Sequence, residues 1–97
     1  MNNTKEIINL LKDLKKYLSE KYKVKEIGIF GSIIRGEQTE KSDIDVLVDF
    51  EMGADLLDLV GLSQFLEEKL SCKVDVIPRR ALRKEIREYV LQQVVQV

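Results

Sequence analysis

The sequence predicts an α+β (or α/β) domain whose elements follow the order α–β–β–α–β–α. Apolar residues near both ends recur every three or four positions, which is typical of amphipathic helices. Between them, short runs rich in β-branched residues alternate with polar ones, as strands do. The chain has 97 residues, a length suited to one folding unit. We therefore expect a single domain spanning residues 1–97.

The first helix is predicted over residues 4–21, because Ile7, Leu11 and Leu18 recur at helical spacing. The next stretch, "VKEIGIF" at residues 24–30, is rich in β-branched and aromatic residues and predicts a strand. A turn, "GSIIRGE", and a polar loop, "EQTEKS", follow this strand.

Residues 43–50, "DIDVLVDF", show the clearest alternation in the chain and predict a second strand. Such a strand separates its side chains onto two faces, one apolar and one mostly acidic. The first face carries Ile44, Val46, Val48 and Phe50, and the second carries Asp43, Asp45, Leu47 and Asp49.

The second half of the chain predicts a helix, a strand and a helix. The first of these helices covers residues 55–70, with Gly61 as a weak point. A short strand over residues 72–78 is stopped by Pro78. The last helix is predicted over residues 79–97, with an inward face made of Leu82, Ile86, Tyr89 and Val90.

Composition excludes several classes of function. The 16 basic and 17 acidic side chains give a net charge of −1, so we expect no direct nucleic-acid binding. The absence of histidine excludes histidine acid–base catalysis and histidine metal sites in this chain. The single cysteine, Cys72, fits a reducing, cytoplasmic environment. Charges interrupt the N-terminal stretch, which is typical of neither a signal peptide nor a membrane span.

Paired aspartates carry the first chemical signal. Residues two apart on a strand share a face, so Asp43 and Asp45 project side by side. Neighbouring carboxylates repel each other unless a positive charge lies between them, and a divalent cation supplies it. If the strand containing Asp75 pairs with the strand at residues 43–50, three acids converge. A site made only of oxygen ligands favours one or two Mg²⁺ ions, and these ions would keep coordination positions open for phosphate oxygens.

A glycine–serine turn carries the second signal. Gly31 lets the backbone approach a ligand closely, and the turn can direct N–H groups at an anion. The hydroxyl of Ser32 adds a donor, so the turn is suited to the outer phosphates of a nucleotide. Arg35, Lys41 and Lys73 are the nearest cations in sequence.

Each signal has an ordinary structural interpretation. A Gly-Ser turn ends many strands, and D-x-D on a strand is often a solvated face; the combination in this order is what favours a site. We interpret Asp49 and Glu51 as solvated edge charges. The basic cluster of Arg79, Arg80, Arg83 and Lys84 is either a solvated helix start or a contact for a partner or a phosphate.

The pattern G-S-x10-D-x-D, followed by an acid on a later strand, resembles the minimal nucleotidyltransferases of the polymerase β superfamily, the MNT or MntA-type antitoxins. The resemblance covers nearly the whole chain. One departure is Ile33, which stands where many relatives carry a basic residue. The residues that match the motif are Gly31, Ser32, Arg35, Gly36, Asp43, Asp45 and Asp75.

The resemblance implies a small mixed β-sheet backed by helices, the polymerase β-like nucleotidyltransferase palm. It implies that Asp43 and Asp45 coordinate Mg²⁺ and, through it, the triphosphate of ATP. Asp75 would help to bind a second metal ion and favour the attacking hydroxyl as its oxyanion. Gly31, Ser32 and Arg35 would contact the nucleotide phosphates, and AMP would be transferred with release of pyrophosphate.

The acceptor is also an expectation from the resemblance. Because the chain stops shortly after the third acid, we expect a shallow half-site that a folded partner completes. The family implies an antitoxin that transfers AMP to a tyrosine of a HEPN-domain toxin. Two alternatives stay open: a non-enzymatic antitoxin that neutralises its partner by binding alone, and a small-molecule nucleotidyltransferase.

Overall fold

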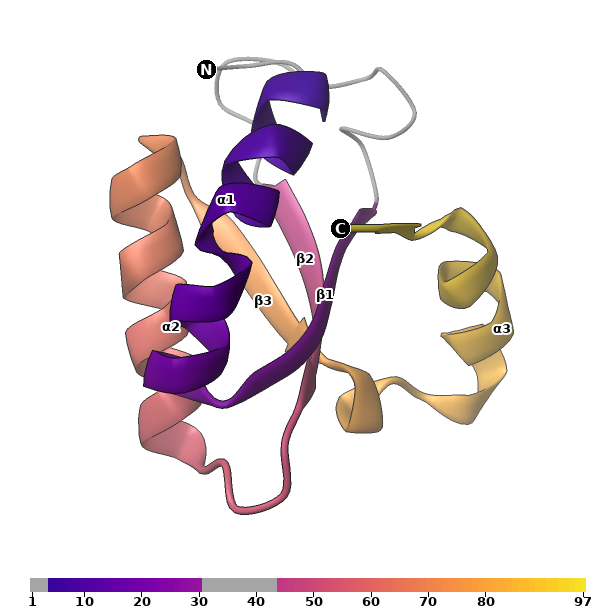
Figure 1. Ribbon diagram of the computed structural model, residues 1–97. Helices are drawn as coiled ribbons and strands as arrows, with labels where there is room; N and C mark the ends of the chain where they lie inside the picture. The colour runs from indigo at the N-terminus through magenta and orange to yellow at the C-terminus, as the bar shows by residue number, and fades with distance from the viewer. Residues whose placement is uncertain (1–3, 31–43) are drawn as a thin grey trace.

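The fold is built on a four-stranded mixed sheet, seen in a computed structural model that describes residues 4–30 and 44–97 (Figure 1). The strand order is β3-β2-β1-β4. Strand β1 (Val24–Phe30) runs antiparallel to both β2 (Ile44–Phe50) and β4 (Val95–Gln96), whereas β2 and β3 (Val74–Pro78) are parallel. The predicted α+β class with a small mixed sheet is confirmed.

Two helices, α1 (Thr4–Tyr22) and α2 (Leu56–Leu70), cover one face of the sheet (Figure 1). A capping box starts α2, because Asp55 and Asp58 each accept a hydrogen bond from the other's backbone N–H, at 3.1 and 3.0 Å. The helix ends at Ser71, whose left-handed φ of 55° terminates the helical hydrogen bonding. Within residues 4–30 and 44–97, no helix is long and apolar enough to cross a membrane.

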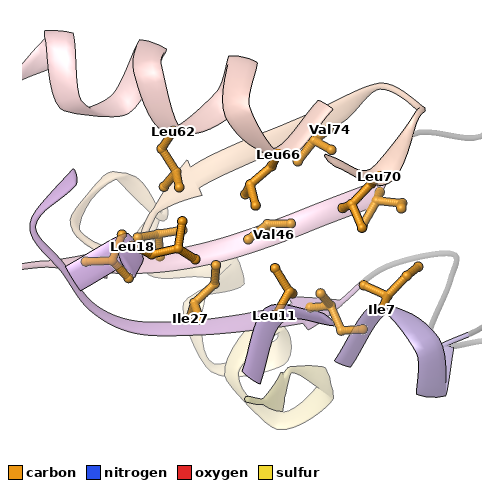
Figure 2. Close-up of a cluster of buried hydrophobic side chains, with 13 residues drawn as sticks. Ile7, Leu11, Leu18, Ile27, Val46, Leu62, Leu66, Leu70 and Val74 are labelled. Carbon is orange, nitrogen blue, oxygen red and sulfur yellow. The ribbon is translucent and has the colours of Figure 1, made fainter. Parts of the chain in front are cut away.

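The main core lies between these helices and the sheet (Figure 2). As the alternation predicted, Ile44, Val46 and Val48 are all 0% exposed and face the helices. On α2, Leu62 is fully buried in this core, whereas Leu56 and Val60 are exposed although they are apolar. The other fully buried members of this core are Ile7, Leu11, Leu18, Ile27, Ile29, Leu66 and Leu70.

The prediction of one continuous helix over residues 79–97 was wrong. A short 3-10 helix, η2 (Arg79–Ala81), follows β3, and α3 covers only Lys84–Gln93. Extended backbone at residues 82 and 83 separates η2 from α3, and extended backbone at residue 94 ends α3. Of the predicted inward residues, Leu82 and Val90 are buried, but Ile86 and Tyr89 are 47% and 58% exposed. The buried face of α3 is therefore narrower than predicted, because Ile86 and Tyr89 do not belong to it.

Strand β4 adds to the edge of β1 next to Gly28, which pairs with Gln96. A Cβ at Gly28 would lie 2.7 Å from Val94 Cγ2 and 2.9 Å from the Val95 carbonyl oxygen. Glycine at this position therefore permits the close approach of the C-terminal strand. The end of the chain is also tied to α1, because Lys15 Nζ donates to the Val97 carbonyl oxygen at 3.0 Å.

Candidate functional site

The sheet has a second face, opposite α1 and α2, and this face carries the candidate site. Directly paired residues on neighbouring strands share a face. Asp45 pairs with Phe30 on β1 and with Asp75 on β3, so all three side chains leave this second face in one row. Adjacent strands lie about 4.8 Å apart. The structure therefore brings Asp45 and Asp75 together, and we call them the acidic pair.

Backbone pairing at the start of both strands fixes the acidic pair in register. The N–H of Ile44 donates to the carbonyl oxygen of Lys73 at 3.0 Å, immediately before the row of Asp45 and Asp75. Asp45 is half-buried and Asp75 is exposed. A rigid backbone thus holds two carboxylates close together, with the outer one open to solvent on strand β3 at the edge of the described sheet.

A small apolar cluster covers the middle of this second face. Leu47 lies on β2 two residues beyond Asp45, and it is buried beneath Leu82 and Val90 from the C-terminal segment. Phe30, the β1 partner of Asp45, also packs against this cluster. The segment from η2 to β4 therefore closes the sheet beside the acidic pair, which limits the freedom of the strands that carry it.

The remaining predicted site residues, Asp43, Gly31, Ser32 and Arg35, together with Lys41, lie outside the described residues. Among the residues that the structure describes, no group of three acidic, histidine or cysteine side chains is gathered to hold a metal ion. The acidic pair supplies two of the three predicted acids. Because both donors are carboxylate oxygens, they fit a hard cation such as Mg²⁺.

A second charged feature lies on the same face at the far end of β2. A hollow of about 420 Å³ is lined by Asp49, Arg79, Arg80 and Arg87, and we call it the arginine hollow. Arg79 Nη1 lies 4.0 Å from Asp49 Oδ2. Asp49 is therefore only partly the solvated charge that the sequence indicated, since its side chain is 34% exposed and also lies near Arg79.

Sequence reasoning found part of this hollow and missed the rest. Arg79 and Arg80 were recognised as members of a basic cluster, but Arg87 was not included. The available signal was helical spacing, because Arg87 follows Arg83 by four positions and lies on the same side of α3. The structure adds that Arg87 Nη2 donates to the Leu82 carbonyl oxygen at 3.3 Å, which holds it against the turn between η2 and α3.

Comparison with known proteins agrees with this geometry. Residues 11–96 match the family model described as a nucleotidyltransferase domain. The protein adenylyltransferase MntA of Thermococcus cleftensis is 43% identical over 97 residues, which cover 100% of this chain and 98% of that protein.

Solved structures show the same likeness. One is described as a candidate minimal nucleotidyltransferase; it superposes with a TM-score of 0.81 at 35% identity, covering 95% of this chain and 94% of that one. A second, a toxin–antitoxin structure with AMP-PNP, has a TM-score of 0.70 at 28% identity, covering 88% and 70% of the two chains. The match of the family model over most of the chain, together with the full-length likeness to MntA, shows that this chain belongs to the nucleotidyltransferase domain family of enzymes.

Proposed function

We propose that this protein is an Mg²⁺-dependent protein adenylyltransferase that transfers AMP from ATP to a tyrosine of a HEPN-type toxin, and so acts as an antitoxin. The observation that carries the proposal is the pairing of Asp45 with Asp75 across two parallel strands. Two carboxylates at that spacing repel each other, and a bound cation relieves the repulsion. The family assignment supplies the reaction class.

In this proposal, the position of each site residue sets its role in the reaction. Asp45, with Asp43 from the sequence motif, would hold Mg²⁺, and bound Mg²⁺ would neutralise and orient the triphosphate. Gly31, Ser32 and Arg35 would contact the phosphates. Asp75 is exposed on β3, so an acceptor hydroxyl can reach it from solvent. The acceptor oxygen would form a bond to the α-phosphorus while the bond to pyrophosphate breaks.

Relatives favour a protein acceptor. MntA of Thermococcus cleftensis is named a protein adenylyltransferase, and the structure with AMP-PNP is that of a toxin–antitoxin pair. An exposed acid at the edge of the described sheet is also suited to a large acceptor, because solvent reaches it directly among the described residues. The resemblance noted from the sequence implies that the partner is a HEPN-type toxin.

The test uses labelled ATP, Mg²⁺ and the product of the neighbouring gene, which the proposal expects to be a HEPN-type toxin. We expect label on the toxin with the wild-type protein, and a roughly 10²–10⁴-fold slower transfer with Asp45→Asn. Asp13→Asn is the matched control, because Asp13 is exposed on α1, away from the second face. Unchanged transfer by Asp45→Asn would show the proposal to be wrong. Full neutralisation of the toxin without any label would favour the binding-only antitoxin.

Metal dependence has a readout separate from catalysis. A ligand that binds the folded state only raises the free energy of unfolding, by about 1.4 kcal/mol at ten times its dissociation constant. We expect Mg²⁺ with a non-hydrolysable ATP analogue to stabilise the wild-type protein by this amount in thermal unfolding. Asp45→Asn and Asp75→Asn should respond much less, whereas Asp13→Asn should respond like the wild type. Equal stabilisation of all four proteins would place the metal elsewhere.

A further inference from the structure

We propose that the arginine hollow docks an acidic segment of the protein acceptor, and so positions the acceptor over the acidic pair. This inference rests on the proposed function for the identity of the acceptor. Three arginines, Arg79, Arg80 and Arg87, line the hollow, and Asp49, which lies near Arg79, partly offsets their charge. Arginine side chains are well suited to carboxylates because they can donate two parallel hydrogen bonds.

The hollow and the acidic pair lie on one face but at different places. Asp49 and Asp45 are on the same strand and the same side of it, four residues apart, which is about 13 Å along β2. The apolar cluster around Leu47 separates them. A folded protein can contact both places at once, whereas one nucleotide phosphate group at the acidic pair cannot reach the hollow.

Charge is distributed unevenly along the chain in a way that favours an acidic partner here. Residues 79–88 carry five basic and two acidic side chains, a net charge of +3. Because the whole chain has a net charge of −1, the remaining residues carry −4. The five basic side chains are Arg79, Arg80, Arg83, Lys84 and Arg87. An acidic segment is therefore attracted to this region and repelled by the rest of the molecule.

The start of α3 adds to the positive charge. The N-terminal end of a helix carries a partial positive charge, and acidic side chains normally stabilise it. Here Arg83 is the N-cap residue and makes no side-chain capping hydrogen bond, Lys84 follows it, and Glu85 is the one acidic residue of the first turn. Cations at this end cost stability in the isolated protein, and a bound carboxylate would offset that cost.

Neighbouring side chains favour a protein segment over a nucleic acid or a free anion. Ile86 and Tyr89 are exposed on α3, the helix that also carries Arg87, and they offer a protein partner apolar contact that a small anion does not need. Asp49 inside the hollow can accept hydrogen bonds from the backbone and side-chain donors of a protein segment, which a free anion does not offer. A nucleic acid backbone extends its negative charge over many nucleotides and would meet the net negative charge of the remaining chain, whereas a short acidic segment can stay within the hollow.

Arg80 gives the sharpest test. It is exposed, and among the described residues it makes no hydrogen bond or ion pair, so its replacement should leave the fold intact. We expect Arg80→Glu to weaken binding of the HEPN-type toxin roughly tenfold or more, measured by calorimetry without nucleotide. Arg80→Ala should weaken it less. Lys12→Glu, an equal charge change on the exposed side of α1, is the matched control and should stay within about twofold of the wild type.

Salt dependence and competition complete the experiment. Raising the ionic strength should weaken toxin binding by the wild-type protein more than by Arg80→Glu, because the variant has lost the attraction that salt screens. If Arg80→Glu and Lys12→Glu bind the toxin with the same affinity, the proposal is wrong. The proposal would also be wrong if Arg80→Glu weakened the binding of pyrophosphate or of an RNA oligonucleotide but left toxin binding unchanged.

The two proposals fail in different ways. Docking is measured without ATP, so Asp45→Asn should bind the toxin as the wild type does while losing transfer. If the wild-type protein transfers no AMP but binds the toxin through Arg80, the enzymatic proposal fails and the docking site stands. If transfer occurs and Arg80→Glu binds normally, the docking site fails and the enzymatic proposal stands.

Discussion

The two faces of one sheet show how a single strand can serve folding and function at the same time. On the side of α1 and α2, β2 presents Ile44, Val46 and Val48, all of them inaccessible to solvent. On the second face the same strand presents Asp45 and Asp49 around a small apolar cluster. Because side chains alternate along a strand, the residues that hold the fold and those that carry charge are neighbours in sequence but not in space.

The two faces of the sheet also differ in how firmly the elements packed on them are held. The main core joins α1, α2 and the strands, whereas α3 is held mainly by Leu82 and Val90 against Leu47. Regions with few buried contacts open at lower free energy than the core. The arginine hollow, which takes its arginines from η2 and α3, therefore lies on the less firmly held side, where a partner's contacts can stabilise it.

The largest expected effect contrasts one leucine from each face. Leu66→Ala removes a fully buried side chain of the main core and should cost about 2–5 kcal/mol of unfolding free energy. Leu82→Ala should cost about 2 kcal/mol or less, because Leu82 belongs to the smaller cluster, whose loosely held helix can close over the space. Urea denaturation followed by circular dichroism measures both. Equal costs would show that the second face is as firmly packed as the first.

Two glycines give the next effect. Gly28→Ala would place a methyl group 2.9 Å from the backbone oxygen of Val95, so β4 must shift, at a cost of about 1–3 kcal/mol. Gly61→Ala meets the ring of Tyr22 at 2.9 Å, but a side chain can move, and alanine gains about 1 kcal/mol of helix propensity. Thermal unfolding should therefore show the larger loss for Gly28→Ala. The reverse order would mean that β4 is not held against β1.

Local pattern was enough to predict most of the main core and to place Asp45 on the opposite face of the sheet. Alternation separated Ile44 and Val46 from Asp45, because the period of two is a property of the strand itself. The meeting of Asp45 with Asp75 needed one further assumption, that β3 pairs next to β2, and the register confirms it.

The C-terminal region resisted prediction because its structure depends on distant residues. A helical pattern could not reveal that the chain leaves the helix after Gln93 to pair with β1, since that pairing depends on the space beside Gly28. The arginine hollow likewise joins Asp49 to residues 30 or more positions later in the sequence. Gly28 in the interior of a strand was the one local sign of a close backbone approach.

A weaker effect is expected from the ion pair at the arginine hollow. Asp49 and Arg79 approach to 4.0 Å with side chains 34% and 51% exposed, so solvent screens their attraction. Asp49→Asn should change the unfolding free energy by less than about 1 kcal/mol. A urea titration at low and at high salt measures this change. A larger, salt-independent loss would show that the pair supports the fold, which would leave less of Arg79 available for docking.

The smallest expected effect is a change of stability with pH that comes from Tyr22, on the face of the sheet covered by α1 and α2. Burial raises the pKa of the Tyr22 hydroxyl above its ordinary value, with smaller contributions from Tyr17 and Glu68. Its ring lies 5.8 Å from that of Phe65, between the two helices. Below the unfolded-state pKa of about 10, the hydroxyl is protonated in both states and stability does not depend on it. As the pH rises toward the higher folded-state pKa, the unfolded chain loses the proton first, so the folded state loses stability.

Tyr22→Phe removes this titration and keeps the ring. In thermal unfolding between pH 8 and pH 11, we expect the wild-type protein to lose more stability than Tyr22→Phe above about pH 10. Tyr89→Phe is the matched control, because Tyr89 is 58% exposed on α3 and its variant should follow the wild-type curve. Identical curves for all three proteins would mean that the hydroxyl of Tyr22 is as well solvated in the folded state as in the unfolded chain, and that the aromatic contact between the helices does not bury it.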